Sequence, residues 1–535
     1  MSLNQAIFQK QLNCLVFTAP LRKLHEDTTC KQRSAEAQFL AAALRILVFY
    51  LMLAAFLSAD SAFATSIPKP LGQINQYVRI NGEFLSSYES WNYFRPESAA
   101  ANNTYDLWVV RSRLGVMLSS AHVDGFAQAQ YSGLYGLPHD AVSSSNGPLG
   151  LGAAYFLANQ SANPNAIFLK QSYVNFKLGE LGLPGASVKT GRFELIEGME
   201  YSSGVEKFDA LKRRRLAERF VGGFNAIYVG RSFDGFSVVY DRPGFNMTVS
   251  GIRPTQGNLT VQGQKEISDI NMLYAALTSK KDSLVPGTEG RLFYLQYDDQ
   301  RDARVVDNRP LSARPLLTDE KLNIHTIGAH VLSLQQFESG SLDALLFGSY
   351  QLGNWTNQSH QAWAIGAEAG YQWHKLPLRP WLRTVYYRSS GDGDAHDGKH
   401  QTFFSAVPSG RLYAKFPFFN QMNIQDIFLE VIVSPAAKAQ ININLHQLSL
   451  ANANDLLYGG LGAALKSGAF GYSGNSAHGH GDIGQLIDIA FTHNYSKHLT
   501  WRLYYGHAFG GNAMKSIFPG KSDANNFLID FNLVF

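Results

Sequence analysis

Apolar and polar residues alternate with a period of two along most of the chain from Gln76 onward. In QININLHQL, for example, the apolar residues Ile441, Ile443 and Leu445 alternate with asparagine and histidine. Successive side chains of a β-strand point to opposite sides, so this pattern predicts strands with one apolar and one polar face. We count eighteen such segments, which begin near residues 76, 105, 123, 166, 186, 232, 244, 268, 289, 322, 341, 361, 380, 424, 439, 483, 498 and 525.

The connections between these segments alternate in length. Short and long connections follow one another in step with the parity of the strands, and an even number of strands joined in this way is typical of bacterial outer-membrane barrels. In that architecture the short connections are periplasmic turns and the long ones are extracellular loops. The clearest short connections are 119–122, 241–244, 434–438 and 496–497, and the clearest long ones are 132–165, 196–230, 299–321, 390–423 and 450–482.

A soluble β-sandwich or propeller would also show alternation, but three features favour a membrane barrel. The faces opposite the apolar ones carry Arg, Asn, Gln and Glu, which a sandwich core could not bury without partners. The loop lengths follow strand parity, for which a sandwich gives no reason. Aromatic residues occur near the ends of the apolar faces, as in interface girdles: Trp108, Trp363, Tyr371, Trp501 and Phe535.

The fold class predicted from these patterns is an all-β, transmembrane, antiparallel β-barrel of about eighteen strands. A sheet can cross hydrocarbon only if it closes on itself, because every backbone N–H and C=O needs a partner there. A barrel of this size is too wide for side chains to fill, so its lumen is expected to hold water.

The N-terminal part of the chain has a different character. An apolar run of twelve residues from Ile46 to Leu57 follows Arg45 and is too short for the ~20 residues of a spanning helix. It is followed by Ala62-Phe63-Ala64, a typical cleavage pattern of secretory signal peptides. We therefore expect residues 1–64 to be an N-terminal extension with a signal peptide, 65–75 a short periplasmic segment and 76–535 the barrel; a buried core helix is the alternative for the apolar run.

Composition and charge restrict the partners and the kinds of reaction that the chain can have. The chain has 13% aromatic and only 16% charged residues, and its net charge of +4 does not indicate a nucleic-acid partner. Removal of residues 1–64 would leave 40 basic and 38 acidic residues. Both cysteines, Cys14 and Cys30, lie in that leader, so the mature chain has no disulfide, cysteine metal ligand or thiol nucleophile.

Arginines dominate the candidate lumen positions. The segment KFDALKRRRLAERFVGGF holds four of them, and a solvated loop or a short surface helix is the alternative to a place in the lumen. In a lumen, fixed guanidiniums would attract carboxylates and repel cations. Arg383 is the weakest candidate, because it shares its parity with Trp381. The basic candidates from parity and from this segment are Arg79, Arg111, Arg113, Arg192, Arg213, Arg214, Arg215, Arg219, Arg383 and Arg502.

Several motifs resemble the alginate-export family of outer-membrane porins. They are GRFELIEGMEYSSG (191–204), RRLAERFVGGF (214–224), YVGRSFDGF (228–236), SSGDGDAHDGKHQTFF (389–404), PFFNQMNIQD (417–426) and GQLIDIAFTH (484–493). The resemblance implies a monomeric eighteen-stranded barrel that passes an anionic polyuronate outward through an arginine-rich constriction. It also implies that Arg192, Arg219 and Arg231 are family motif arginines, with Glu194 and Asp234 as ion-pair partners.

The resulting hypothesis is an outer-membrane channel for an anionic solute, with export of an anionic polysaccharide such as alginate as the first candidate. Uptake of small anionic nutrients is the nearest alternative, and an adhesin or structural barrel is another. The expected partners are outer-membrane lipids and lipopolysaccharide, the barrel-assembly machinery and periplasmic export proteins. A barrel enzyme would need a nucleophile beside a histidine such as His446 or His507, and no spacing indicates one.

Metal binding has weak support in the sequence. SGDGDAHDG places Asp392, Asp394 and Asp397 in one loop, an oxygen-rich spacing that could hold Ca²⁺. Phe403 stands where the twelfth-position glutamate of an EF-hand would be, so a solvated loop is the alternative. His478 and His480 lack an evident third ligand, and no cofactor is otherwise expected.

The chain ends in FLIDFNLVF, an amphipathic strand whose last residue is Phe535. We expect it to pair with the first strand near Val78–Phe84 and so remove both edges of the sheet. Phe531, Leu533 and Phe535 resemble the C-terminal signal that outer-membrane barrels present to their assembly machinery.

Overall fold

The computed structural model describes residues 75–97, 101–223, 228–409 and 413–535. The chain divides into two units, residues 1–70 and 71–535, and all described residues belong to the second. The predicted signal peptide with Ala62 and Ala64 lies outside the described residues. No helix of the described part is long and apolar enough to cross a membrane.

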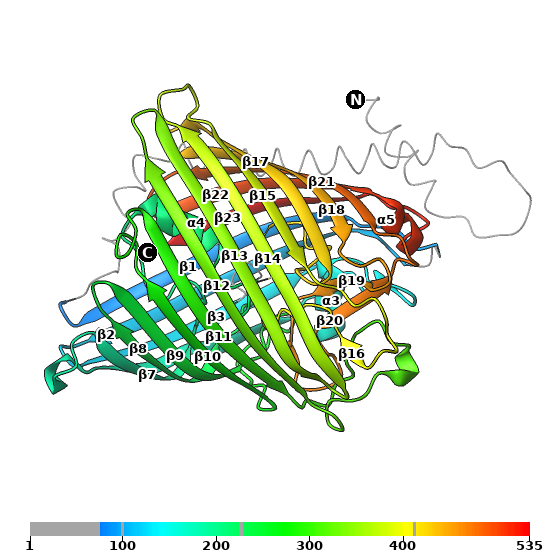
Figure 1. Ribbon diagram of the computed structural model, residues 1–535, viewed down its shortest axis with the longest axis horizontal. Coiled ribbons are helices and arrows are strands. Elements are labelled where there is room, and N and C mark those ends of the chain that lie inside the picture. The colour runs from blue at the N-terminus through cyan, green and yellow to red at the C-terminus, as the bar shows by residue number, and fades with distance from the viewer. Residues whose placement is uncertain (1–74, 98–100, 224–227, 410–412) are drawn as a thin grey trace, which may run out of the picture. The chain divides into compact units, whose positions relative to one another are not determined.

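Eighteen antiparallel strands form a closed barrel, and each predicted strand start lies within three residues of the observed one (Figure 1). The barrel strands are β1 (Val78–Asn92), β2 (Thr104–Ser119), β3 (Val123–Tyr135), β6 (Asn165–Lys177), β7 (Ala186–Phe193), β8 (Phe233–Asp241), β9 (Phe245–Pro254), β10 (Ile270–Ser279), β11 (Thr288–Asp299), β12 (Leu322–Gln336), β13 (Gly340–Trp355), β14 (Gln358–Trp373), β15 (Trp381–Ser389), β17 (Ile424–Ala436), β18 (Ala439–Leu450), β21 (Asp482–Asn494), β22 (Leu499–Gly510) and β23 (Ala524–Val534).

The other elements lie in the connections. Two short hairpins form there, and β16 pairs in parallel with β14. These elements are β4 (Val142–Ser143), β5 (Gly147–Pro148), β16 (Lys399–His400), β19 (Leu456–Gly460), β20 (Tyr472–Ser476), α3 (Leu151–Asn159), α4 (Glu206–Arg215), α5 (Asn512–Ile517) and the 3-10 turns η1 (Gly179–Leu181) and η2 (Leu311–Ala313).

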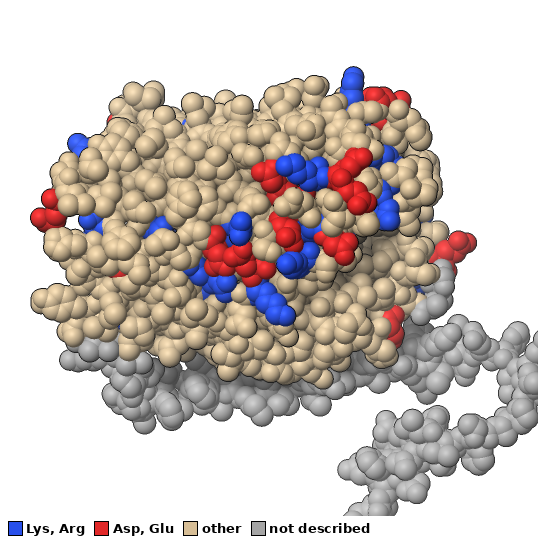
Figure 2. Space-filling view, turned by 90° about the horizontal axis from the view of Figure 1, so that it is seen from below, with Lys and Arg blue, Asp and Glu red and all other residues tan. Residues whose placement is uncertain are grey.

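The alternation of apolar and polar residues matches the two faces of the wall. In β14 the small or polar residues Ala362, Ala364 and Glu368 are buried toward the lumen, whereas Trp363 and Ile365 are exposed on the outside. Barrels in membranes present such apolar residues to lipid. In the view of Figure 2 most of the face is uncharged, and many of the charged side chains lie together near its middle.

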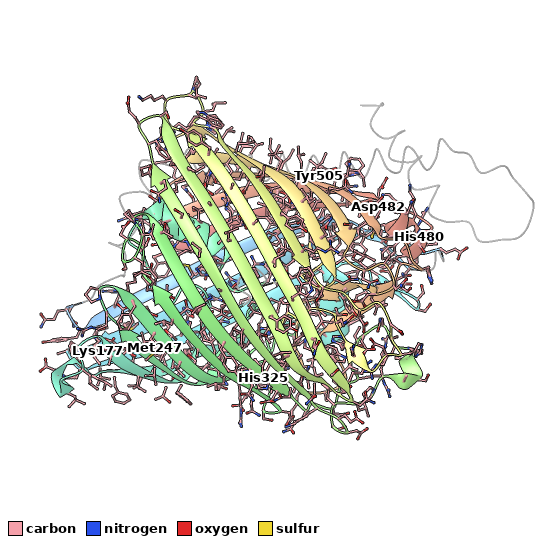
Figure 3. All side chains as sticks on the ribbon, in the orientation of Figure 1. Lys177, Met247, His325, His480, Asp482 and Tyr505 are labelled. Carbon is pink, nitrogen blue, oxygen red and sulfur yellow. The ribbon has the colours of Figure 1, made fainter. Side chains whose placement is uncertain are left out.

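Short turns join the strands at one end of the barrel and long loops at the other. Figure 3 shows Lys177, the last residue of β6 before a short turn, and His480, from a long loop, on opposite sides of the molecule. The alternation predicted from the sequence is confirmed with one exception. The connection between β13 and β14, on the long-loop side, contains only residues 356–357.

The barrel closes where β23 pairs with β1. The backbones of Phe535 and Gly82 exchange two hydrogen bonds, of 2.9 and 3.0 Å, and Val534 pairs with Glu83. Pairing of the last strand with the first is confirmed, but it covers residues 82–92 rather than Val78–Phe84. The ring of Phe535 lies over Gly82 at a place where a Cβ atom would collide with it, so the absence of a side chain at Gly82 permits this position of the ring.

The apolar core lies inside the barrel, because the long loops fold into the lumen. Aromatic side chains from residues 390–423 and 451–481 are fully buried there, including Phe403, Phe404 and Phe470. Phe404 and Phe470 contact the ring of Trp355 on β13 edge to face, with ring centroids 5.4 and 5.7 Å away. Packed loops therefore fill the lumen at the long-loop end.

Candidate functional site

The described part of the connection between β7 and β8, residues 194–223 and 228–232, enters the lumen and carries helix α4 (Figure 1). Phe208 and Leu211 of α4 are buried in an apolar cluster with inward side chains of four wall strands, namely Leu332, Leu334, Leu345, Trp381 and Ile432. The arginine-rich segment is therefore an internal plug rather than a solvated loop or surface helix.

The charge distribution of α4 suits a helix. Glu206 and Asp209 lie in its first turn, and Lys212, Arg213, Arg214 and Arg215 lie in its last. This arrangement places negative charge at the positive end of the helix dipole and positive charge at its negative end. Asp209 also accepts the backbone N–H of Ser203 at 2.9 Å, which fixes the start of the helix.

Glu430 on β17 binds α4 to the barrel wall. Its Oε1 accepts from Arg214 at 2.9 Å and its Oε2 from Arg215 at 2.5 Å. Arg383 on β15 donates to the same Oε2 at 2.9 Å and to Glu368 on β14 at 2.8 Å. The wall carboxylates thus neutralise much of the charge of the helix.

The parity argument against Arg383 was wrong, because Arg383 and Trp381 both face the lumen. Asp343 on β13 accommodates the two side chains together. Its Oδ1 accepts from Arg383 at 2.9 Å and its Oδ2 from the indole N–H of Trp381 at 2.7 Å. The ammonium of Lys207 from α4 lies 4.2 Å from the centre of the Trp381 ring. An indole with a bound N–H and a cation over its face is stable in a polar lumen.

Strand β11 holds the plug at two further points. Lys212 of α4 donates to Glu289 at 2.9 Å, and both side chains are almost fully buried. Arg291 donates to Glu197 and Glu200, at the start of the lumen connection, at 3.1 and 2.8 Å. Arg215 of α4 also lies 3.4 Å from Glu368 on β14, so contacts with β11, β14 and β17 hold α4 from several directions.

Arg219 joins the plug to a second loop. It is buried and donates to Gln421 and to the hydroxyl of Tyr413 at 2.9 Å each, both in the connection 390–423. Its guanidinium lies 4.3 Å from the ring centre of Phe347 on β13. Arg219 therefore joins two loops to each other, and its buried guanidinium is not accessible to an anion.

Arg231 is also buried, and its guanidinium donates to the carbonyl of Leu461 at 2.9 Å. Burial lowers the pKa of Arg231 to about 10. Its own carbonyl accepts Lys170 at 2.7 Å. Of the motif arginines, Arg219 and Arg231 thus bind loops to each other and to the wall.

Arg111 and Arg113 face the lumen as predicted, but wall carboxylates surround them. Arg111 forms an ion pair with Glu83 on β1. Arg113 lies 3.5 Å from Glu83 and 3.7 Å from Glu194, and Lys170 lies 3.3 Å from Glu194. Glu194, expected as a partner of a motif arginine, thus lies beside Arg113 and Lys170.

Arg192 does not line the lumen. It pairs with Asp234 through two hydrogen bonds of 2.7 and 2.6 Å, so the predicted partnership with Asp234 is present. Asp234 follows the fully buried Phe233 and shares its side of β8 with the exposed Phe236, which places the pair on the outer face. Lys189, on the other side of β7, has the inward parity. Positive-φ glycines in β7 and β8 made the face hard to assign from sequence.

The two remaining parity candidates lie in different surroundings. Arg79 is exposed at the start of β1, at the short-turn end of the barrel. Arg502 on β22 donates to Asp530 on β23 at 3.3 Å and keeps 38% of its side chain exposed. Of these two, only Arg502 belongs to the interior passage.

A cavity of about 480 Å³ separates α4 from β17, β18, β21 and β22. Five basic and three acidic side chains line it. They are Arg213, Arg214, Arg215, Lys415 and Arg502, and Glu218, Glu430 and Asp488. The cavity therefore brings together the predicted residues Arg213, Arg214, Arg215 and Arg502, while the other arginine candidates lie elsewhere.

Two groups control the charge of this cavity. Arg213 is exposed and makes no hydrogen bond or ion pair with any described residue, so its charge is available to a solute. Glu218 follows α4, and burial raises the pKa of its carboxyl to about 6. The electrostatic balance of the cavity is thus positive and depends on pH.

The acidic loop does not form a metal site. Among the described residues, no three His, Cys, Asp or Glu side chains form a group that could hold a metal ion. The carboxylates of Asp392, Asp394 and Asp397 instead accept backbone N–H groups two residues further along, at 2.8 to 3.1 Å. These hydrogen bonds hold the loop in tight turns, and they explain why the three aspartates stand so close together in the sequence.

The sequence prediction missed the carboxylates that hold the plug. Glu289, Asp343 and Glu430 occupy inward positions of their strands, and this parity was the available signal. Their partners on α4 could not be assigned, since the contact depends on a connection of 39 residues folding back into the lumen.

Comparison with known structures defines the class of fold. The fold is that of outer-membrane porins, and the sequence identities are low. A BenF-like porin from Pseudomonas fluorescens Pf-5 gives a TM-score of 0.53 with 10% identity, covering 86% of this chain and 100% of that chain. Pseudomonas aeruginosa OccK9 (OpdG) gives 0.52 with 9% identity over 87% and 99%, and OccD3 (OpdP) of the same species gives 0.51 with 10% over 88% and 96%.

The family follows from the sequence itself. A family model described as alginate export matches residues 142–526. The chain therefore belongs to the alginate-export family of outer-membrane barrels, which confirms the resemblance. Family and fold place it in the bacterial outer membrane, among channels rather than enzymes. A search of curated proteins gave no match.

Proposed function

We propose that the barrel passes anionic solutes through the cavity beside α4, and that the physiological solute is an acidic polysaccharide such as alginate. The observation that carries the proposal is the excess of basic over acidic side chains around the cavity, with Arg213 available to a solute. Fixed guanidiniums in a confined lumen favour anions over cations. Membership of the alginate-export family supports the choice of a polyuronate.

Uptake of small anionic nutrients is the second candidate. Two observations favour it: the cavity measures only about 480 Å³, and packed loops fill the long-loop end of the lumen. A polymer requires a continuous bore, whereas a small acid requires only a chain of cavities. Export would therefore need the connection 390–423 to move away from Arg219, while uptake of a small acid would need a smaller change.

The biogenesis that we infer is secretion directed by residues 1–64, followed by insertion by the barrel-assembly machinery. Lipopolysaccharide and periplasmic export proteins are the proposed neighbours of the monomeric barrel. The secretion and insertion steps rest on the signal-like segment and on the C-terminal residues Phe531, Leu533 and Phe535, and the proposed neighbours and the monomeric state rest on the family.

Conductance in planar bilayers tests the proposal. The mature chain should pass Cl⁻ in preference to K⁺, and Arg213→Glu should reduce or reverse that preference, while Arg79→Glu at the exposed barrel end should change it less. A wild-type channel that prefers K⁺ would disprove the proposed function. Oligouronates of increasing length and small carboxylates, compared as blockers, then separate export from uptake.

A further inference from the structure

The lipid-facing side of the wall carries an apolar groove of about 410 Å³. It crosses the neighbouring strands β12, β13, β14 and β15, which lie side by side in Figure 1. Gly348 lies in its floor, where an added Cβ atom would meet open space. The outward residues that line the groove are apolar apart from one phenol: Ala329, Val331, Leu346, Gly348, Ile365, Ala367 and Tyr386.

The register of the strands gives the groove a direction. Ala329, Gly348, Ile365 and Arg388 are cross-strand neighbours in that order, so they form one row across the four strands. Ala329 is the middle residue of β12, whereas Arg388 is the last outward residue of β15 before the chain turns into the lumen. Barrel strands are tilted by about 35–45°. The row is therefore oblique and leads from the long-loop rim down into the hydrocarbon.

Arg388 lies at the long-loop end of the groove. It follows Tyr386 on the outer face of β15 and pairs across the strands with Ile365, and both of these residues line the groove. On the rim side of the row lie the cross-strand neighbours Tyr350 and Trp363, which expose 47% and 37% of their surface. Tyrosine and tryptophan on an outer face mark the level of lipid head groups. Arg388 is thus placed where the groove meets the head groups.

The charge of Arg388 has no acidic partner in the described part of the chain. Its terminal nitrogens donate to Gln425 at 3.3 Å and to the carbonyl of Ala451 at 3.4 Å, and it forms no ion pair with a described residue. Arg253 on the outer face of β9 differs, because it pairs with Glu266 at 3.2 Å. A guanidinium has five N–H donors, so Arg388 retains donors and charge for an anionic group such as a phosphate.

We propose that the groove binds lipid A, the anchor of lipopolysaccharide, with a phosphate on Arg388 and an acyl chain along the row from Ile365 to Ala329. Lipid A is anionic and forms the leaflet on the long-loop side of an outer membrane, so its charge and its position both fit. A second copy of the chain fits less well, because the same groove on another barrel offers no carboxylate to Arg388. The inference concerns the lipid-facing wall and does not depend on the solute that the lumen passes.

Binding of lipid A to the assembled mature barrel in detergent, measured by native mass spectrometry, tests the proposal. We expect one tightly bound lipid A per wild-type barrel. Arg388→Gln should weaken its binding about tenfold, the effect of losing a hydrogen bond from a charged group. Removal of the phosphates from lipid A should weaken binding to the wild type by a similar factor, and should change binding to Arg388→Gln much less. Arg253→Gln removes another outer-face charge and should bind lipid A like the wild type.

Filling the groove tests the place of the acyl chain. Gly348→Leu should weaken binding about tenfold, since roughly two buried methylene groups account for that factor. Gly290→Leu is the matched control, because it also adds a leucine at an outward glycine with open space, but outside the groove. Ala367→Leu replaces Gly348→Leu if the latter does not assemble, and heat-dependent gel mobility identifies the folded barrels.

Equal binding of lipid A by the wild type and Arg388→Gln, or by the wild type and the groove-filling variant, would overturn the proposal. Phosphatidylglycerol that binds as tightly as lipid A would overturn it too, because the site would then accept any anionic lipid. A wild-type dimer that Gly348→Leu converts to a monomer would assign the groove to a second copy instead. The proposed function fails separately, through a wild-type channel that prefers K⁺.

Discussion

The guanidinium of Arg215 donates to Glu430 at 2.5 Å and so ties the last turn of α4 to strand β17. Arg214 and Arg383 donate to the same carboxylate. Except for Arg214, all these side chains are almost fully buried. The plug that narrows the lumen is therefore held by charge pairs, which are sensitive to the loss of one partner.

Replacing Glu430 should release the plug. Glu430→Gln would leave three guanidiniums without their shared carboxylate, and we expect the free energy of unfolding to fall by about 3–5 kcal/mol. Urea unfolding of the assembled barrel measures this change. Glu266→Gln removes the exposed partner of Arg253 and serves as the control, with an expected loss below about 1 kcal/mol. Similar losses in the two variants would contradict the anchoring role.

Anion preference should rise as the pH falls. Burial raises the pKa of Glu218 to about 6, so its carboxylate is charged at pH 8 and mostly neutral at pH 5. Loss of this negative charge makes the cavity more positive. The Cl⁻ to K⁺ permeability ratio should therefore increase between pH 8 and pH 5 with a midpoint near 6. Glu218→Gln should hold the higher ratio throughout, and an unchanged pH curve in this variant would exclude Glu218 as the cause.

The wall could be predicted from the sequence because each strand is determined locally. Alternation fixed the strand starts to within three residues, since a one-residue slip would turn every apolar side chain of a strand toward water. The same argument placed Arg111, Arg113 and Arg502 in the lumen. It failed at Arg192, where β7 and β8 contain glycines with positive φ, Gly191 and Gly235, directly opposite each other.

The site could be predicted only in part, because its contacts join residues far apart in the chain. The arginine-rich segment was recognisable, but which arginines remain available depends on the wall acids that they meet. Arg215 binds Glu430, 215 residues away, whereas Arg213 makes no hydrogen bond or ion pair with a described residue. Trp381 shows the same limit, since an inward tryptophan is acceptable only with Asp343 beside it.

The long-loop end should lose stability as the pH rises toward 7. Burial raises the pKa of Asp392 to about 7, and the neighbouring Asp455 contributes to the shift. The unfolded chain ionises near pH 4 while the folded loop resists ionisation, so stability declines between about pH 4 and pH 7. Asp392→Asn should therefore raise the melting temperature at pH 8 and leave it unchanged at pH 4. Asp397→Asn, at an exposed position of the same loop, is the control.

A gain from Asp392→Asn at both pH values would contradict this explanation. It would show that the side-chain amide contributes through a new hydrogen bond instead. The main chain of Asp392 is fixed in either case, because its N–H donates to Asp455 at 2.9 Å.

The seam between the first and last strands should be the most sensitive part of the wall. Gly82→Val would place a branched side chain where the ring of Phe535 lies, and deletion of Phe535 would remove two backbone hydrogen bonds with Gly82. Both changes leave sheet edges less well paired, and unpaired edges favour aggregation. We expect each to reduce the yield of assembled barrel in the outer membrane at least about tenfold, because loss of the seam prevents closure.

Gly125→Val provides a matched control, because a Cβ at this β3 glycine would meet no atom within 4 Å. Its yield of assembled barrel should stay close to that of the wild type. Membrane fractionation and the heat-dependent gel mobility of folded barrels measure both outcomes. If Gly82→Val assembled as well as Gly125→Val, the ring of Phe535 would be able to leave its position over Gly82 without loss of the seam, and its packing there would not contribute to closure.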